Sequence, residues 1–464
     1  MRRTKIVATL GPSTADRATI SAILSAGADV LRLNAAHSNV EELERLLAEV
    51  RAAEAELGRS VGVLVDLPGP KLRVGEMAPG TVLAEGSAFA LVSAHCTGDS
   101  AHACVSYEGL FEDLAEGNRV LLNDGSIELI VTGVRPGEVM TRVDVGGPLA
   151  SFKGVNVPHI TLGVDSITEY DRQVLTWAMG SQVDYIGQSF VRSGADIEAL
   201  RALMTTRVLP IVAKIEKHEA VARLDEIFEA ADVVMVARGD LGVETAPEEV
   251  PVIQRRIVAA ARATDTPVVI ATQMLESMTH AKRPTRAEAS DVANSIFARV
   301  DAVMLSGETA VGEYPVVVVE TMARIALAAE EAMPRRRDSY HEATADVQVA
   351  VSAAVCNLAT DLGLAAIVPA TESGATALAV AQHRPTTAII AATPSAAVAR
   401  RLSLVWGVHS LLIQFSPDTD TLLDAVSSAL VEARWAIPGQ RIAITAGRSS
   451  RTSGGTDFIL VRTL

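Results

Sequence analysis

Three ionisable residues in two short segments have the types and spacing of a site that handles charge. Lys214 and Glu216 stand one residue apart in IVAKIE, and Asp240 lies in ARGDLG. Residues two positions apart on a strand point to the same side, so the ammonium and the carboxylate would share one face. Glu216 and Asp240 offer oxygen ligands, and no cysteine or histidine completes a zinc set. This donor set favours Mg²⁺ or Mn²⁺, which proteins hold with one or two carboxylates and the oxygens of the substrate.

Further positive charge and free backbone amides suit an anionic substrate. Arg32, Arg73 and Lys153 add fixed cations. The glycines of ARGDLG leave the amides of Gly239 and Asp240 open to a carboxylate or phosphate at a helix start. A divalent metal, a desolvated lysine and several arginines together suit phosphoryl transfer or stabilisation of an enolate. The sequence has no GxxxxGK[ST] segment, so a Walker loop would not hold a nucleotide.

Eight short apolar runs, most of them followed by helical periodicity, must position these residues. Continuously apolar strands are typical of a parallel sheet that is buried on both faces. Eight such βα units favour a closed (β/α)8 TIM barrel, an α/β fold, over an open doubly wound sheet, which needs no particular count. The predicted strands cover residues 5–9, 29–33, 61–66, 183–188, 209–214, 232–237, 267–272 and 301–305, and the clearest helices cover 41–57 and 250–264.

Almost every predicted strand ends in a polar or charged residue, although the strand bodies are apolar. In a barrel of this type the carboxyl ends of the strands meet at one rim, where active sites lie. A salt bridge or a helix cap explains any one of these residues as well, but their convergence favours a polar site. They are Arg32, Asn34, Asp66, Ser189, Lys214, Glu216, Arg238, Gly239, Asp240, Thr272, Ser306 and Glu308.

Two segments interrupt the alternation of strands and helices. Residues 79–147 are rich in glycine and β-formers and contain the turn sequence Asn-Asp-Gly-Ser at 123–126, so we expect a small all-β domain inserted after the third strand. The polar stretch 334–343 is typical of a linker, and a second αβ alternation follows it. The predicted domains are a barrel at 1–69 and 154–335, an inserted β domain at 70–153 and a C-terminal α/β domain at 345–464.

The composition excludes several classes of partner. Lys plus Arg number 41 against 56 Asp plus Glu, a net charge of −15, so most of the surface would repel a nucleic acid or an anionic membrane. Three scattered cysteines are too few for a disulfide framework or a thiolate metal site. The apolar runs fall far short of the ~20 residues of a membrane helix, and the first residues do not form a secretory signal. We expect a soluble, cytoplasmic protein.

The polar residues described so far fall in a series of longer segments. They are KIVATLGPST (5–14), RLNAAH (32–37), DLPGPKLRVG (66–75), KGVNVP (153–158), IVAKIEKHEAVARLDEI (211–227), VMVARGDLGVE (234–244), ATQMLESM (271–278), RPTRAEASDVAN (283–294) and MLSGETAVGEYP (304–315). In this order they resemble the pyruvate kinase family over essentially the whole chain. The resemblance implies transfer of the phosphoryl group of phosphoenolpyruvate to ADP, which gives pyruvate and ATP in the last step of glycolysis. It also implies that the inserted β domain is a closing lid.

The same resemblance implies roles for individual residues. Glu216 and Asp240 would hold the essential Mg²⁺, and Lys214 would stabilise charge on the moving phosphoryl group. Arg32 and Arg73 would contact phosphate, and Arg73 and Lys153 of the lid would bind the nucleotide. The backbone amides of Gly239 and Asp240 would bind the substrate carboxylate. The face where the enolate carbon takes its proton would be shaped by Thr272, Ser306 and Glu308.

The family's site for a monovalent cation uses an Asn, a Ser, an Asp and a Thr, and it is altered here. Asn34 and Asp66 remain, whereas the Ser and Thr positions hold Ala36 and Leu67. Lys71 stands where potassium-requiring members have Glu. An ammonium group beside the site can replace the charge of K⁺ at close range, so we predict that K⁺ is not required. The alternative is a damaged cation site with Lys71 pointing to solvent.

The C-terminal domain carries TESGAT at 371–376, on a strand-to-helix turn. The matching loop of the family binds a phosphate of a regulatory sugar phosphate or nucleotide. Helix-start amides and hydroxyls at Thr371, Ser373, Gly374 and Thr376 could do so here, with the loop 448–456 closing over them. The basic residue often found in this loop is absent, so loss of regulation is the alternative to a sugar-phosphate or AMP effector. Family members are usually homotetramers.

Two other functions are compatible with parts of this pattern. A metal-dependent carbon–carbon lyase on the same kind of barrel would also use paired carboxylates and an enolate, but it needs neither the lid nor Lys214 and Lys153. A catalytically silent metabolite sensor would keep the barrel as a scaffold and the C-terminal domain as a ligand switch. Against the sensor, every residue assigned to metal and phosphoryl chemistry is present.

Overall fold

A computed structural model describes residues 1–107, 109–333, 346–416, 418–447 and 456–464. Backbone contacts divide the chain into two compact units, which are described separately below. The first unit comprises Met1–Asp66, Ala178–Ile186 and Ala261–Leu464, and the second comprises Leu67–Trp177 and Gly187–Ala260. The predicted linker at 334–343 lies outside the described residues, and the predicted domain boundaries stay predictions.

Eight strands in the described part of the chain form a closed barrel in the order β1-β16-β15-β14-β13-β12-β3-β2. Pairing within each unit is parallel, and in the β2–β3 register Asn34 lies opposite Asp66. The closed barrel confirms the predicted fold class and excludes the open doubly wound sheet. The strands are β1 Lys5–Leu10, β2 Val30–Asn34, β3 Gly62–Leu67, β12 Tyr185–Gln188, β13 Ile211–Ile215, β14 Val233–Ala237, β15 Val268–Ala271 and β16 Ala302–Leu305.

Helices follow the barrel strands, and their local sequences explain where they begin and end. In α2, for example, the Asn39 side chain caps the first turn, Leu43, Leu46 and Val50 are buried at helical spacing, and Gly58 ends the helix in a left-handed conformation. The helices are α1 Arg17–Ala26, α2 Val40–Leu57, α4 Glu169–Gly180, α5 Gly194–Ala202, α6 His218–Ala222, α7 Leu224–Ala230, α8 Arg238–Glu244, α9 Val250–Ala263, α10 Arg286–Phe297, α11 Gly307–Ala310 and α12 Pro315–Ala332, with 3-10 turns η1 Pro12–Thr14, η2 Ala35–His37 and η3 Glu276–Thr279. None of the helices in the described residues is long and apolar enough to cross a bilayer.

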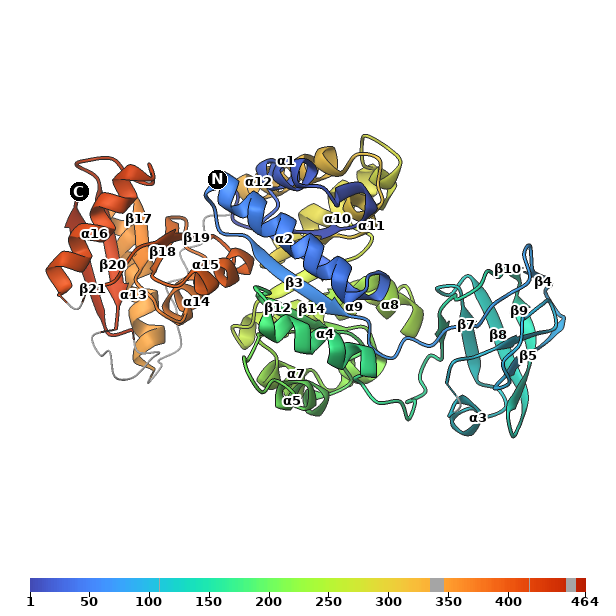
Figure 1. Ribbon diagram of the computed structural model, residues 1–464. Helices are drawn as coiled ribbons and strands as arrows, with labels where there is room; N and C mark the ends of the chain where they lie inside the picture. Colours follow the sequence, from blue (N-terminus) through green and yellow to red (C-terminus); the bar gives the residue numbers. More distant parts are fainter. Residues whose placement is uncertain (108, 334–345, 417, 448–455) are drawn as a thin grey trace. The chain divides into compact units, whose positions relative to one another are not determined.

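The insertion after β3 is all-β apart from one short helix, as predicted, and we call it the lid. Figure 1 shows its main sheet, which has the order β11-β7-β8-β9-β5-β6. The predicted turn at 123–126 connects β7 to β8, with Asn123 and Asp124 at positive φ. The sheet includes β11, which lies beyond residue 153, the last residue predicted for this domain. The elements are β4 Val82–Leu83, β5 Ala88–Val92, β6 His102–Cys104, α3 Leu110–Asp113, β7 Arg119–Leu122, β8 Ile127–Arg135, β9 Glu138–Val145, β10 Gly147–Pro148 and β11 Val155–Asn156.

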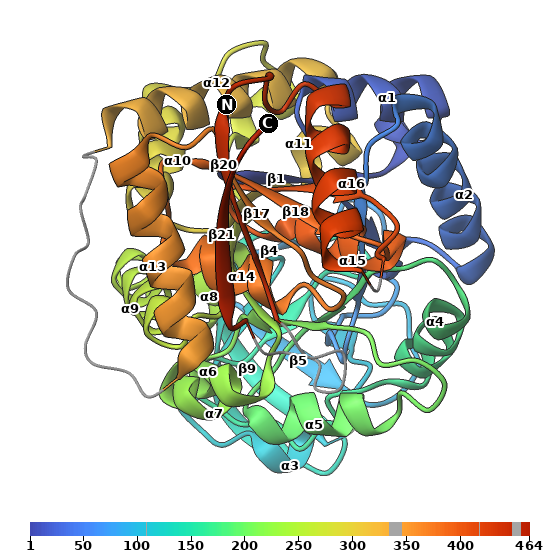
Figure 2. The same cartoon turned by 90° about the vertical axis from the view of Figure 1, so that its left-hand side faces the viewer.

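The C-terminal α/β domain has a five-stranded sheet in the order β19-β18-β17-β20-β21 within its described residues. The sheet is parallel except for β21, which pairs antiparallel with β20. Alternate residues of β17 pack into two apolar clusters, one containing α13 to α15 and the other α16, and Figure 2 shows α13 and α16 on opposite sides of the sheet. The elements are α13 Val347–Leu362, β17 Ala366–Pro369, α14 Ala375–Gln382, β18 Ala388–Thr393, α15 Ala396–Arg401, η4 Leu402–Leu404, β19 Val408–Leu412, α16 Thr419–Glu432, β20 Arg441–Ala446 and β21 Phe458–Thr463.

The first residue of β1 is a buried lysine. Lys5 is 3% exposed, and its ammonium donates a hydrogen bond to the carbonyl of Val408, 2.6 Å away. Burial lowers the pKa of Lys5 from 10.5 to about 8, and the nearby carboxylate of Asp29 opposes this shift. The group therefore loses its proton within an accessible pH range.

This burial predicts a pH-dependent stability. Because the pKa of Lys5 is lower in the folded chain, the unfolded chain binds more protons between pH 8 and pH 10.5. The free energy of unfolding should therefore rise across this window, by about 3 kcal/mol from this group. Denaturant unfolding of the parent and of Lys5→Met at pH 8 and at pH 10.5 measures this effect. The free energy of unfolding of the parent, relative to that of Lys5→Met, should be about 3 kcal/mol higher at pH 10.5 than at pH 8. A difference that does not depend on pH would contradict a buried charge at Lys5.

Candidate active site

The second unit places Lys214 in a buried polar cluster at the carboxyl end of β13. The Lys214 ammonium lies 2.8 Å from Oε1 of Glu216 and donates to the hydroxyl of Ser189 at 2.8 Å. Ser189 in turn donates to the carbonyl of Leu67 at 2.7 Å. The other oxygen of Glu216 accepts the backbone N–H of Phe190 at 2.9 Å. The lysine and the carboxylate are thus held in direct contact by neighbours from two further strand ends.

Asp240 lies in the first turn of α8 beside Gly239, and it contacts a lysine that is distant in sequence. Nζ of Lys71 is 3.2 Å from Oδ1 of Asp240 and 3.8 Å from a carboxylate oxygen of Asp124, in the β7–β8 turn of the lid. The Lys71 side chain is 27% exposed. The ammonium therefore lies against carboxylates within its own unit rather than extending into solvent.

Glu216 and Asp240 form a donor set that fits a hard divalent cation. Burial raises the pKa of Glu216, the neighbouring Lys214 lowers it, and the negative charge of Asp240 raises it further. A bound cation would relieve both the burial cost and the repulsion. Within the described residues no group of three or more His, Cys, Asp or Glu is arranged to hold a metal. A cation on these two carboxylates would need further oxygens from substrate or water, which is the usual arrangement for Mg²⁺.

Arg73 and Lys153 lie on two paired segments at the base of the lid. Arg73 forms an isolated bridge with Gly154, and the Val74 amide donates to the carbonyl of Lys153 at 2.9 Å. The Arg73 guanidinium donates to the carbonyl of Phe152 at 2.9 Å. The structure therefore places these two cations close together along the backbone.

In the first unit, Arg32 is fixed by a buried carboxylate. Its Nη2 lies 2.6 Å from Oδ2 of Asp66, its Nε donates to the same oxygen at 2.8 Å, and its Nη1 donates to the hydroxyl of Thr9 at 3.2 Å. Asn34 caps the short η2 turn, where its side chain accepts the N–H of Ala36 at 3.2 Å. Asp66 thus orients an arginine, and Asn34 has a local structural role.

Thr272, Ser306 and Glu308 follow β15 and β16 in the same unit. Glu308 is fully buried and accepts the N–H of Ser306 at 2.7 Å and that of Leu275 at 3.1 Å, so it links the two loops. Thr272 and Gln273 both have positive φ, at 67° and 55°. Such backbone is unusual for a β-branched residue, and strain of this kind is concentrated at functional sites.

Comparison with known proteins decides the family. The family model described as pyruvate kinase, barrel domain, matches residues 1–319, and the one described as pyruvate kinase, alpha/beta domain, matches residues 349–462. This chain belongs to the pyruvate kinase family. It is similar to the pyruvate kinase of Geobacillus stearothermophilus, with 42% identity over 100% of this chain and 80% of the relative, and to that of Methylorubrum extorquens, with 41% identity over 99% and 97%. It also superposes on a pyruvate kinase from Cryptosporidium parvum with a TM-score of 0.92, 29% identity and coverage of 100% and 96%.

Within this pyruvate kinase fold, the contacts group the predicted site residues by unit. One unit joins Lys214 to Glu216 and Lys71 to Asp240, and the other joins Arg32 to Asp66 and Ser306 to Glu308. These residues belong to strands of one closed barrel, or to the loops and first helical turns that follow its strands. The roles assigned to them stay predictions.

In the predicted effector loop, hydroxyl groups of the loop itself already accept backbone N–H groups at the start of α14. The Thr371 hydroxyl accepts the N–H of Gly374 at 2.9 Å, and the Ser373 hydroxyl accepts that of Ala375 at 3.4 Å. The hydroxyl of Thr376 lies 2.8 Å from that of Thr456. The rest of the predicted closing loop, residues 448–455, lies outside the described residues. A phosphate on this turn would have to compete with the hydroxyls for its amides.

Two residues that position the site received no role from the sequence. Ser189 was recognised only as a polar strand end, yet its hydroxyl holds the Lys214 ammonium. Thr9 lies inside β1 and contacts Arg32. A hydroxyl near the carboxyl end of an otherwise apolar strand is the only local signal for Thr9.

Proposed function

We propose that this chain transfers the phosphoryl group of phosphoenolpyruvate to ADP, giving pyruvate and ATP. The observation that carries the proposal is the buried contact of Lys214 with Glu216 at the carboxyl end of β13, in a chain whose barrel and α/β domains both match the pyruvate kinase family. No observation on the described residues favours the silent sensor or the lyase.

The chain's own residues manage charge and protons in this reaction. The bond between phosphorus and the enol oxygen breaks, its electron pair stays on the enolate, and an oxygen of the terminal ADP phosphate forms the new bond. Lys214 stabilises the charge on the phosphoryl oxygens, and its poor access to water makes that interaction strong. Arg32, fixed by Asp66 and Thr9, contacts phosphate. The enolate carbon takes its proton on the face formed by Thr272.

Glu216 and Asp240 are the residues that would hold Mg²⁺ or Mn²⁺. When bound, the cation supplies positive charge that neutralises phosphate and enolate oxygens. Arg73 and Lys153 of the lid would bind the nucleotide, and the backbone amides of the first α8 turn would bind the substrate carboxylate. A lid that excludes water makes ADP, and not solvent, the acceptor of the phosphoryl group.

Pyruvate formation from phosphoenolpyruvate and ADP, with and without Mg²⁺, tests the proposal directly. We expect turnover that depends on both ADP and the divalent cation. If the folded protein forms no pyruvate even when sugar phosphates and AMP are present, the proposal is wrong and the silent sensor becomes the better explanation.

We also propose that Lys71 makes the enzyme independent of K⁺, because its ammonium supplies a positive charge next to Asp240. Turnover by the parent should be equal in buffers with saturating K⁺ and in buffers free of K⁺ and Na⁺. Lys71→Gln should lower turnover by about 10- to 100-fold in the absence of K⁺, the effect of one charge at close range. Steady-state rates in the two buffers measure both effects.

Lys282→Gln is the matched control for this prediction, because Lys282 is an exposed lysine that stacks on Tyr314. It should leave turnover unchanged in both buffers. A parent enzyme that is active only with K⁺ would keep the kinase activity but exclude Lys71 as the built-in cation.

The pathway, the oligomeric state and the regulation of the enzyme can also be proposed. We propose that the enzyme catalyses the last step of glycolysis in the cytoplasm, as a homotetramer, and that a sugar phosphate or AMP regulates it through the 371–376 turn. Light scattering on the purified protein tests the tetramer. A shift of the phosphoenolpyruvate saturation curve by sugar phosphates or AMP tests the effector, and an unshifted curve would mean that regulation has been lost.

A further inference from the structure

A pocket of about 440 Å³ lies within the first unit, where the barrel meets the C-terminal domain. This volume is within the range of about 300–1,000 Å³ that is typical of sites for small molecules. Its walls come from the segments that precede β1, β16, β18 and β19, at the amino ends of these strands, and from the end of α12, whereas barrel active sites lie at the carboxyl ends. The pocket therefore belongs to neither the catalytic residues nor the 371–376 turn.

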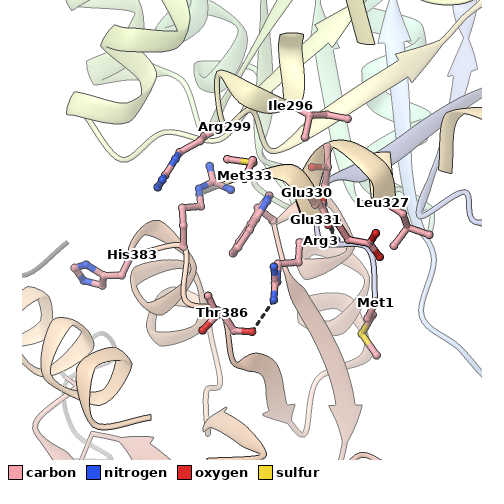
Figure 3. Close-up of a pocket in the computed structure, with 13 residues that line it drawn as sticks. Met1, Arg3, Ile296, Arg299, Leu327, Glu330, Glu331, Met333, His383 and Thr386 are labelled. Carbon is pink, nitrogen blue, oxygen red and sulfur yellow. Dashed lines mark hydrogen bonds between the residues drawn. The ribbon is translucent and has the colours of Figure 1, made fainter. Parts of the chain in front are cut away.

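Its walls carry three arginines. In Figure 3, Arg299 and His383 lie on one side of the pocket and Arg3 lies on the other, with Glu330 and Glu331. The third arginine, Arg384, also lines the pocket.

Two of these arginines occupy backbone positions that favour glycine. Arg299 follows α10 with φ 67°, and Arg384 follows α14 with φ 48°. In each case the backbone N–H donates to the carbonyl three residues earlier, at 2.8 Å from Ile296 and 2.9 Å from Ala381. Glycine is the usual residue at such a left-handed helix end because it avoids the steric cost of a Cβ. Arg434 has the same conformation after α16 outside the pocket, so the backbone alone does not assign a role to Arg299 and Arg384, whereas their place in the pocket wall does.

The carboxylates that line the pocket do not pair with the guanidinium of Arg3 within the described residues. Glu330 accepts the backbone N–H groups of Arg3 and Thr4, with the shortest contact 2.6 Å from Thr4. Glu331 is exposed to solvent. The Arg3 guanidinium donates only to the carbonyl of Thr386 among its side-chain contacts with described residues. The nearest carboxylates thus leave room for an external anion.

Arg384 adds a donor that lacks an acceptor. Its Nη2 donates to Asp301 at 3.0 Å, and its guanidinium lies 4.8 Å from the centre of the Trp406 ring. Its Nη1 is buried and has no hydrogen-bond partner among the described residues. Buried polar groups are almost always paired, so this nitrogen is a donor that the described residues leave unsatisfied beside the pocket.

We propose that this pocket binds a small dianion, a phosphate monoester or a dicarboxylate, through the guanidinium groups of Arg299, Arg384 and Arg3. Both ligand types present paired oxygens that match the planar fork of arginine. Because the walls come from the barrel and from the C-terminal domain, such a ligand would bind to both.

The key variant is Arg299→Gly, which removes a guanidinium and also relieves the left-handed backbone. Arg434→Gly is the matched control, since Arg434 has φ 60° after α16 and does not line the pocket. Both are made in a Lys214→Met background, so that the catalytic site does not contribute a second phosphate-binding event. Arg3→Ala, at an unstrained position, is an independent second variant.

Isothermal titration with glycerol 3-phosphate and with succinate, against chloride at matched ionic strength, is the measurement. We expect one or both dianions to bind the background protein and Arg434→Gly with the same affinity. Affinity should fall at least about tenfold in Arg299→Gly and in Arg3→Ala, the effect of one charged hydrogen-bond donor. Binding of only one probe identifies the ligand as a phosphate ester or as a dicarboxylate.

Two results would overturn the proposal. One is that neither dianion binds. The other is that binding is unchanged in both Arg299→Gly and Arg3→Ala while their melting temperatures stay at the background value. In either case the arginines serve only to hold the two domains together. The titration does not depend on catalytic activity, so it stands whatever the outcome of the pyruvate assay.

Discussion

Replacing Lys214 by Met should lower the turnover number for pyruvate formation by about 10³-fold or more, since a charged donor in a site of low dielectric has few substitutes. Lys214 is 8% exposed, and its ammonium contacts Ser189 and Glu216. Methionine retains most of the length of the lysine side chain but supplies no charge to the moving phosphoryl group. The coupled pyruvate assay at saturating phosphoenolpyruvate, ADP and Mg²⁺ measures the loss.

Lys217 provides a closely matched control, because it is also buried and forms an ion pair, 2.9 Å from Glu244. Lys217→Met breaks a buried pair of the same kind without removing a group assigned to the reaction. We expect it to lower stability by an amount similar to that of Lys214→Met and to retain most of the turnover. Equal loss of turnover in the two variants would show that Lys214 supports the fold and not the chemistry.

Replacing Asp184 by Ala should lower the free energy of unfolding by about 3–5 kcal/mol, the usual effect of removing one partner from a buried ion pair. Asp184 is fully buried. Its carboxylate lies 2.6 Å from Nη2 of Arg51 and 3.0 Å from Nε of Arg400, and it accepts the N–H of Val63 at 2.9 Å. The substitution removes this carboxylate from two largely buried guanidinium groups, of which Arg51 keeps Glu54 as a partner and Arg400 loses its paired carboxylate. Urea unfolding followed by circular dichroism measures the change.

Asp424→Ala is the control for this effect. Asp424 also pairs with an arginine, Arg462, but its side chain is 69% exposed, so we expect a loss of only about 0–1 kcal/mol. Arg400 belongs to α15 of the C-terminal domain and Asp184 belongs to the barrel, so the Asp184 variant also tests whether this ion pair joins the two. If both variants lose the same small amount, the buried pair does not contribute as the contacts indicate.

The barrel and most of its elements could be predicted from local patterns in the sequence. All eight predicted strands are present to within one or two residues at each end, because uninterrupted apolar runs fix strands that are buried on both faces. The hairpin turn at 123–126 could also be predicted from its own residues, since Asn, Asp and Gly adopt positive φ readily. The order of the polar segments was sufficient to indicate the family, which the comparisons confirm. The largest difference between the predicted and the observed elements lies at the end of the lid. Strand β11 is too short to have a sequence pattern of its own, and it depends on pairing with β7.

The pairing of charged groups, in contrast, became visible in the folded chain alone. Lys71 contacts Asp240, 169 residues away in the sequence, and the network at Asp184 draws on Arg51 and Arg400 from distant segments. The raised pKa of Glu216 and the lowered pKa of Lys5 also follow from burial, which no spacing of residue types encodes. The pocket lined by Arg299 and Arg384 exists only because two helix ends and the first residues of the chain converge. The physical reason is that periodicity and turn preference act over a few residues, whereas ion pairing and desolvation depend on groups that only folding brings together.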